Sequence, residues 1–153
     1  MADGDPLPPN DHGVHYCKPS QVDKGQVLAP AFMLEGTHEE LSLTWLECLG
    51  NAPRLDQLRA AREAMLSSLF RPKPNGWFAT IQVQAITSLT SVAGQALDLR
   101  VTHCPVVGND CHGGVYGLPS RDSELARAVG IELARRIDGS PVLVRNVVTP
   151  FPA

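Results

Sequence analysis

The sequence has few aromatic residues and no long hydrophobic run. Aromatic side chains make up 5% of the 153 residues, so we expect leucine, valine, isoleucine and alanine to form most of the core. No apolar run approaches the roughly 18 residues that a membrane-spanning helix requires. Hydrophobic residues still make up 43% of the chain, which is typical of a globular protein. Length and composition together predict one folded domain.

Basic residues are not in excess. The formal net charge is −3, which argues against a broad phosphate-binding surface without excluding a local basic patch. The N-terminal residues, MADGDPLPPNDHG, lack the basic start and apolar segment of a secretory signal. We therefore expect a cytoplasmic protein with no membrane contact, whose cysteines stay reduced: Cys17, Cys48, Cys104 and Cys111.

The chain is expected to divide into a short tail and one folded region. Residues 1–11 contain three prolines and three acidic residues, and such a segment buries too little apolar surface to order itself. We therefore predict a disordered tail over residues 1–11. Residues 12–149 form the predicted single globular domain.

Apolar periodicity predicts the elements of this domain. Alternation is clearest in residues 41–46, LSLTWL, and we expect this strand to form a hairpin with residues 28–34. Apolar residues recur every three or four positions in two further segments, which predicts two amphipathic helices near residues 54–70 and 122–138. Further strands are expected at residues 12–17, 77–86, 99–103, 115–118 and 142–148, and residues 87–96 are expected to be a short helix or a loop. This pattern indicates an α+β fold, a two-layer sandwich of a mostly antiparallel sheet with both helices on one face.

The stretch 99–119, LRVTHCPVVGNDCHGGVYGLP, concentrates residues whose side chains can do chemistry. A hairpin here would place the pair His103-Cys104 beside the pair Cys111-His112. These residue types bind zinc, but structural zinc sites separate the ligands of a pair by about two to five residues. Each pair here is adjacent in sequence, and neighbouring side chains of a strand point to opposite faces. The spacing therefore argues against a four-ligand zinc site.

A histidine-centred site fits the stretch better. His103 and His112 would come from the two strands, His12 or His15 from the first strand, and Asp110 would orient a ring. Histidine titrates near neutral pH, so the set could act as general acid and base. Alternatively, His103 and His112 could hold one divalent metal ion with an open coordination position. The competing interpretation is that these are ordinary histidines hydrogen-bonded to the backbone.

Other interpretations stay open. Cys111 could be a nucleophile with His103 as its base, although no recognised local signature accompanies it. Cys104 and Cys111 could form a disulfide, which a reducing compartment disfavours, and Cys48 reads as a core residue. A nucleic-acid surface could be formed by basic residues of the first predicted helix and of the segment after it. They are Arg54, Arg59 and Arg62 on the helix, and Arg71 and Lys73 after it. A solvated helix face is the simpler explanation of that cluster.

Several segments also carry a resemblance to a known group of proteins. They are residues 12–16, LSLTWLE at 41–47, PKPNGWFATIQV at 72–83, VTHCP at 101–105, and the segment from His112 into GLPSRDSELA at 117–126. Together they resemble a group of small bacterial proteins with no known activity, over about residues 12–137. The resemblance implies a bacterial, cytoplasmic, stand-alone domain, and it implies no functional residues.

Two hypotheses about function lead. The first is a histidine-centred hydrolase or nuclease-like enzyme that cleaves a phosphoester or acyl bond, with or without a divalent metal ion. It requires the histidines to converge within about 4 to 6 Å in a cleft. The second is a non-catalytic accessory module of a bacterial operon that binds another protein, which requires an exposed apolar patch. Nucleic-acid binding without catalysis is the third.

Overall fold

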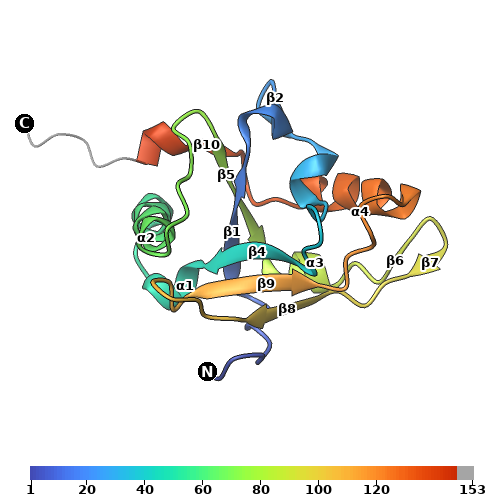
Figure 1. Ribbon diagram of the computed structural model, residues 1–153, viewed down its shortest axis with the longest axis horizontal. Coiled ribbons are helices and arrows are strands. Elements are labelled where there is room, and N and C mark those ends of the chain that lie inside the picture. The colour runs from blue at the N-terminus through green and yellow to red at the C-terminus, as the bar shows by residue number, and fades with distance from the viewer. Residues whose placement is uncertain (148–153) are drawn as a thin grey trace, which may run out of the picture.

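The computed structural model describes residues 1–147, and its centre is a six-stranded antiparallel sheet (Figure 1). The strand order is β10-β5-β1-β4-β9-β8. The strands of this sheet are β1 (His12–Cys17), β4 (Glu40–Trp45), β5 (Trp77–Gln82), β8 (Arg100–His103), β9 (His112–Tyr116) and β10 (Val142–Leu143). Two small hairpins flank it, β2–β3 (Val22–Asp23, Gln26–Val27) and β6–β7 (Ser91–Val92, Gln95–Ala96). The predicted α+β class with a mostly antiparallel sheet is confirmed.

The helices are short apart from two. These two are α2 (Arg54–Ser67) and α4 (Glu124–Arg135). The others are α1 (Leu46–Leu49), α3 (Val83–Thr87) and the 3₁₀ helices η1 (Pro19–Gln21), η2 (Ala29–Phe32) and η3 (Val144–Val147). The side chain of Ser123 begins α4 by accepting a hydrogen bond from the Ala126 N–H at 3.1 Å, the usual role of serine at this position.

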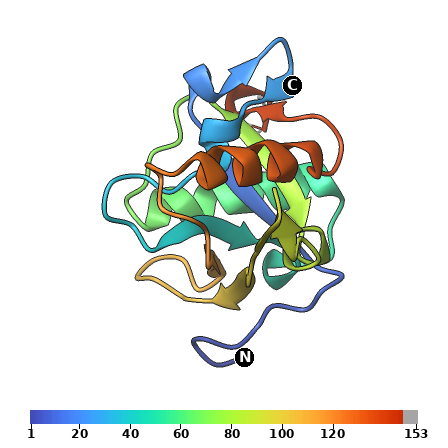
Figure 2. The same ribbon diagram turned by 90° about the vertical axis from the view of Figure 1, so that its right-hand side faces the viewer.

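The two long helices lie on opposite faces of the sheet, in place of the single helical layer that we expected. Leu58, Ala61 and Met65 of α2 pack with Val14 and Phe78 on one face. Leu133 and Val129 of α4 belong to the larger core cluster on the other face, together with many sheet residues. In Figure 2, α4 crosses in front of the sheet and α2 lies behind it. Successive strand residues point to opposite faces, so β5 supplies Phe78 to one core and Ala79 to the other.

The segment 28–34 is not a strand. Residues 29–32 form the 3₁₀ helix η2, which packs against α4 instead of β4. Pro30 lacks the N–H that a sheet ladder needs, and it stands at the start of η2, where proline is well tolerated. The predicted hairpin of residues 28–34 with 41–47 is therefore wrong: β4 pairs with β1 and β9. Residues 87–96, expected to be a helix or a loop, contain the hairpin β6–β7.

The N-terminal segment is ordered, contrary to our prediction of a disordered tail. The Leu7 N–H donates to the Val101 oxygen at 3.0 Å, and the His103 N–H donates to the Asp5 oxygen at 2.8 Å. Leu7 itself is only 4% exposed. The outer edge of β8 has backbone groups with no strand partner, and the N-terminal segment hydrogen-bonds to them. Burial of the Leu7 side chain adds apolar contact, so the segment is ordered in spite of its prolines. The predicted domain end at residue 149 lies outside the described residues.

No helix within residues 1–147 has the length and apolar character needed to cross a bilayer.

Candidate functional site

A cleft of about 710 Å³ opens where β1 and β4 separate. The two strands pair only through Gly13 with Trp45 and Val14 with Thr44. Beyond these pairs, β1 continues along β5 as far as Cys17, and β4 continues along β9 from Glu40. Residues 15–17 and 40–43 therefore have a strand partner on one side only, within the described part of the chain. The cleft volume falls within the roughly 300–1,000 Å³ that is usual for ligand sites.

The lining of the cleft is mainly apolar, with charged residues among it. Its apolar side chains include Val14, Ala31, Met33, Leu41, Leu43, Met65, Phe70 and Val106. Its charged side chains are Lys18, Glu35, Glu40, Arg71 and Lys73, and its histidines are His15, His38 and His112. Lys18 and Glu35 form an ion pair with 2.7 Å between nitrogen and oxygen. The lining therefore combines an apolar surface with a few polar groups, as ligand sites generally do.

Three half-buried side chains beside the cleft form a Glu–Cys–His cluster. The Cys104 Sγ lies 3.3 Å from Glu40 Oε2 and 3.3 Å from His112 Nδ1. One ligand atom from each residue lies within 4.8 Å of the others, and no other such group of three or more occurs within residues 1–147. Glu40 and His112 also line the cleft.

The sheet register brings the cluster together. Glu40 of β4 lies opposite Tyr116 of β9, and Thr44 lies opposite His112, so Glu40 and His112 emerge on the same face. Cys104 follows β8, and its N–H donates to the His112 oxygen at 3.0 Å. A side chain at Gly114 would collide with the Glu40 carboxylate. Glycine at that position is therefore what lets the carboxylate lie over β9.

Burial and neighbouring acid groups determine the charge of this cluster. Burial, followed by the Glu40 carboxylate, raises the pKa of the Cys104 thiol to about 12. Burial, followed by the nearby Cys104 and Glu40, raises the pKa of the Tyr116 hydroxyl to about 12. At neutral pH the thiol is protonated and donates to Glu40 Oε2. Cys104 is therefore not a nucleophile on its own, because the reactive form is the thiolate.

The cluster has the donor set of a transition-metal site. Thiolate, imidazole and carboxylate are all zinc ligands, and catalytic zinc sites use three protein ligands and keep one position open. The His112 Nδ1–H donates to the Cys104 backbone oxygen at 2.8 Å, with this tautomer inferred from the contact. Metal-bound histidines commonly donate one ring N–H to a carbonyl in this way.

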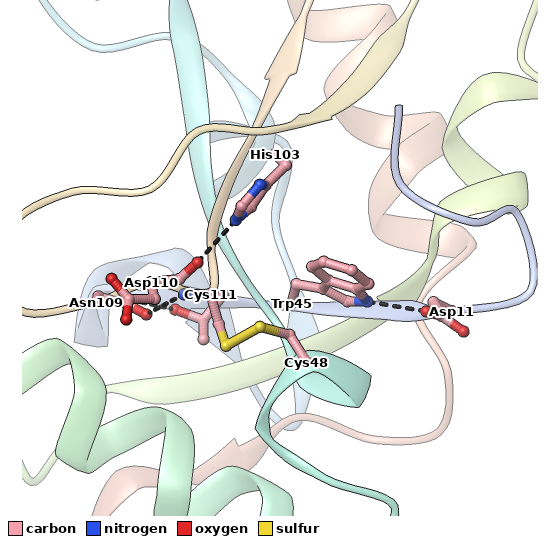
Figure 3. Close-up of a disulfide and its surroundings, with 8 residues drawn as sticks. Asp11, Trp45, Cys48, His103, Asn109, Asp110 and Cys111 are labelled. Carbon is pink, nitrogen blue, oxygen red and sulfur yellow. Dashed lines mark hydrogen bonds between the residues drawn. A yellow bond between two sulfur atoms is a disulfide. The ribbon is translucent and has the colours of Figure 1, made fainter. Parts of the chain in front are cut away.

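His103 lies on the opposite face of the sheet from His112. Its Nε2 donates to the backbone oxygen of Asp110 at 2.7 Å, and its ring meets Trp45 edge to face at 5.7 Å between centroids (Figure 3). Its Nδ1 is buried without a hydrogen-bond partner among the described residues. The Asp110 side chain is exposed, and Asp110 contacts the histidine only through its backbone. The structure thus does not bring the predicted pair His103 and His112 to one metal ion.

The two N-terminal histidines, His12 and His15, lie in different places and do not form one site with each other. The His12 Nδ1 lies 2.7 Å from Glu47 Oε2, and its Nε2 lies 3.8 Å from Asp138, outside the cleft lining. His15 lines the cleft, and its Nδ1 donates to the Ser42 oxygen at 2.8 Å. Burial lowers the pKa of His15, against the opposing effect of its backbone hydrogen bonds. Of the five predicted site residues, His15 and His112 reach the cleft.

Cys48 and Cys111 form a disulfide, so the prediction that all cysteines are reduced is wrong (Figure 3). The bond joins α1 to the start of β9 across 63 residues of sequence. It removes Cys111 as a nucleophile and excludes the considered pairing of Cys104 with Cys111. Cys17 is buried, and burial raises its pKa to about 12. No local spacing in the sequence indicates this bond, because its two halves meet only through the pairing of β4 with β9.

The arginines of α2 do not form a free basic surface. Arg59 pairs with Asp56 at 2.8 Å, Arg62 with Glu63 at 3.4 Å, and Arg54 with Asp138 at 3.4 Å. Arg71 and Lys73 make no ion pair with any residue between 1 and 147. Only these two cations of the predicted basic group are left to meet a ligand, and both line the cleft.

Sequence reasoning missed Glu40 and the role of Cys104. The sulfur of Cys104 meets the carboxylate of Glu40 across 64 residues of sequence, so no local motif connects them. Comparison with protein-family models, curated proteins and solved structures finds no match for this chain.

Proposed function

We propose that the protein is a metal-assisted hydrolase in which Glu40, Cys104 and His112 hold one zinc ion beside the cleft. The observation that carries this proposal is the cluster itself: three ligand atoms within 4.8 Å of one another, two of them from residues of the cleft lining. The proposal keeps the hydrolase hypothesis from the sequence and replaces His103 as a ligand by Glu40 and Cys104.

Zinc would supply a nucleophile at neutral pH. A zinc-bound water has a pKa of about 7 and attacks an acyl or phosphoryl centre. Cys104 would bind as the thiolate, so binding of the ion would release its proton. His15 lines the same cleft and offers a second titratable ring to a bound substrate.

The test is the metal content of the purified protein and of matched variants. We expect one zinc ion per chain, and loss of at least about 90% of it in His112→Ala and Cys104→Ser, since second-shell changes alone already weaken metal binding about 10- to 100-fold. His12→Gln is the control, because His12 pairs with a carboxylate outside the cleft. Hydrolysis of p-nitrophenyl acetate and of bis(p-nitrophenyl) phosphate should follow the zinc content. A zinc content that is zero, or that His112→Ala leaves unchanged, would overturn the proposal.

A partner-binding module is the second candidate. Leu69 is 86% exposed and Val107 is 96% exposed, and the loop at Gly108 packs against the backbone of Ser67 at the end of α2. These apolar side chains lie beside the cleft residues Phe70 and Val106 in the sequence. Under this alternative the protein binds no zinc, and Leu69→Ser weakens association with a partner protein.

The disulfide also bears on the compartment. Disulfides persist in oxidising compartments and are rare in the cytosol. The bond between Cys48 and Cys111 therefore favours an oxidising compartment over the cytoplasm that the composition suggested.

A further inference from the structure

The charges that line the cleft do not cancel. Lys18 and Glu35 neutralise each other at 2.7 Å, and Glu40 belongs to the Glu–Cys–His cluster. Arg71 and Lys73 line the same cleft and have no ion-pair partner within residues 1–147. Two cations without a protein partner beside an apolar surface select an anionic group on the ligand.

The cleft also has two backbone edges. Beyond the pair Val14–Thr44, residues 15–17 of β1 and 40–43 of β4 have no strand on the sides that face each other. Among these groups, the Ser42 oxygen accepts a hydrogen bond from His15. Free strand edges pair with extended chains, and this pairing is how many proteins bind peptides. A fatty acid or an inorganic anion would use neither edge.

The apolar lining of the cleft is the third feature that suits a peptide, after the two cations and the free strand edges. Leu41 and Leu43 line the cleft from the core on one face of the sheet, and Met65 lines it from the core on the other face. Successive side chains of an extended peptide point to opposite sides, so apolar side chains of the peptide can meet the lining on either face.

We infer that the cleft binds a short extended peptide with an apolar residue near its end and a free C-terminal carboxylate that pairs with Arg71 and Lys73. This inference rests on the proposed function and names its substrate class. In the reaction, the oxygen of water bonds to the acyl carbon of a peptide bond, the C–N bond breaks, and the amine leaves with a proton from water. No other reactant is consumed.

The test measures binding separately from hydrolysis. The probe is N-acetyl-Val-Ala-Leu as the free acid and as its C-terminal amide, titrated by calorimetry into protein freed of metal with a chelator. We expect the acid to bind about tenfold more tightly than the amide, as charge-assisted hydrogen bonds to Arg and Lys would give. Arg71→Gln with Lys73→Gln should remove this difference. The control is Lys24→Gln with Arg127→Gln, which lowers the net charge equally at residues outside the cleft lining.

The outcomes separate the two proposals. Equal affinity for acid and amide, or no binding by either, overturns the peptide inference whatever the zinc content. Octanoate that binds as tightly as the peptide also overturns it, because the strand edges would then contribute nothing. Selective binding of the acid, in a protein that neither holds zinc nor cleaves the peptide, supports the peptide site and overturns only the hydrolase.

Discussion

His103 and His112 belong to neighbouring paired strands, and their side chains leave the sheet on opposite faces. The register pairs His103 with Gly113, which places His112 one residue out of step. A shift of one residue reverses the face of a strand side chain. His112 therefore joins Glu40 and Cys104 beside the cleft, whereas His103 packs against Trp45.

This arrangement predicts different roles for the two histidines. His103→Ala should lower the free energy of unfolding by about 2 kcal/mol, because it removes a buried ring and its hydrogen bond to Asp110. It should leave the zinc content per folded chain unchanged. Urea unfolding and metal analysis of the same preparation measure the two quantities. Loss of zinc from a fully folded His103→Ala protein would contradict the assignment of faces.

The disulfide predicts a large effect of reduction. A cross-link between residues 63 positions apart restricts the unfolded chain enough to stabilise the fold by about 4 kcal/mol on the chain-entropy model. Urea unfolding with and without dithiothreitol should show this loss, and Cys48→Ala with Cys111→Ala should be insensitive to the reductant. The denatured, non-reduced protein should titrate with two free thiols, Cys17 and Cys104. Four free thiols would show that the bond does not form.

His15 predicts a loss of stability in acid. Burial lowers its pKa in the folded protein, whereas the unfolded value is about 6.5. Below that pH the unfolded chain binds a proton that the folded chain does not bind, so the free energy of unfolding falls as the pH falls from about 6.5. The contribution of this group to stability is fully present above about pH 6.5. The slope from one such group is at most about 1.4 kcal/mol per pH unit.

The measurement is urea unfolding at several pH values for the original protein and for His15→Gln. The variant should lose this part of the acid dependence, while His38→Gln, which changes an exposed histidine of the same cleft, should keep it. Identical slopes in the original protein and in His15→Gln would show that the ring titrates as freely when folded as when unfolded.

Local patterns in the sequence predicted the elements better than their partners. The spacing of Leu58, Ala61 and Met65 located α2, and the alternation in LSLTWL located β4, because each pattern reports which side of one element is buried. The neighbours of β4 are set by contacts distant in sequence, which is why the hairpin with residues 28–34 was wrong. The helices were placed on one face for the same reason.

The site shows the same limit. Residues 99–119 were singled out from the sequence, and two of the three cluster residues, Cys104 and His112, come from them. Glu40 contributes through the register of β4 against β9, and Cys111 is committed to Cys48 through the same pairing. The local spacing of residues in the sequence indicates neither the contact of Glu40 with the cluster nor the bond between Cys48 and Cys111. The order of the N-terminal segment was not predicted, because its prolines and acidic residues indicate disorder. The burial of Leu7 depends on β8, which is distant in sequence.

The end of α2 predicts a substitution that stabilises the protein. The helix closes with the Phe70 N–H donating to the Met65 oxygen and the Leu69 N–H donating to the Leu66 oxygen, the pattern in which glycine normally follows the helix. Leu69 occupies that position with a φ of 67°, a left-handed conformation that costs a residue with a Cβ about 1 kcal/mol. Its side chain is 86% exposed, so truncation removes little packing.

We therefore expect Leu69→Gly to raise the free energy of unfolding by about 0.5 to 1 kcal/mol, after the greater freedom of glycine in the unfolded chain is subtracted. The control is Ala60→Gly inside the same helix, which should lower it by about 1 kcal/mol. Urea unfolding of both variants at one pH gives the comparison. A loss of stability in Leu69→Gly equal to that in Ala60→Gly would mean that Leu69 does not hold the left-handed conformation in solution.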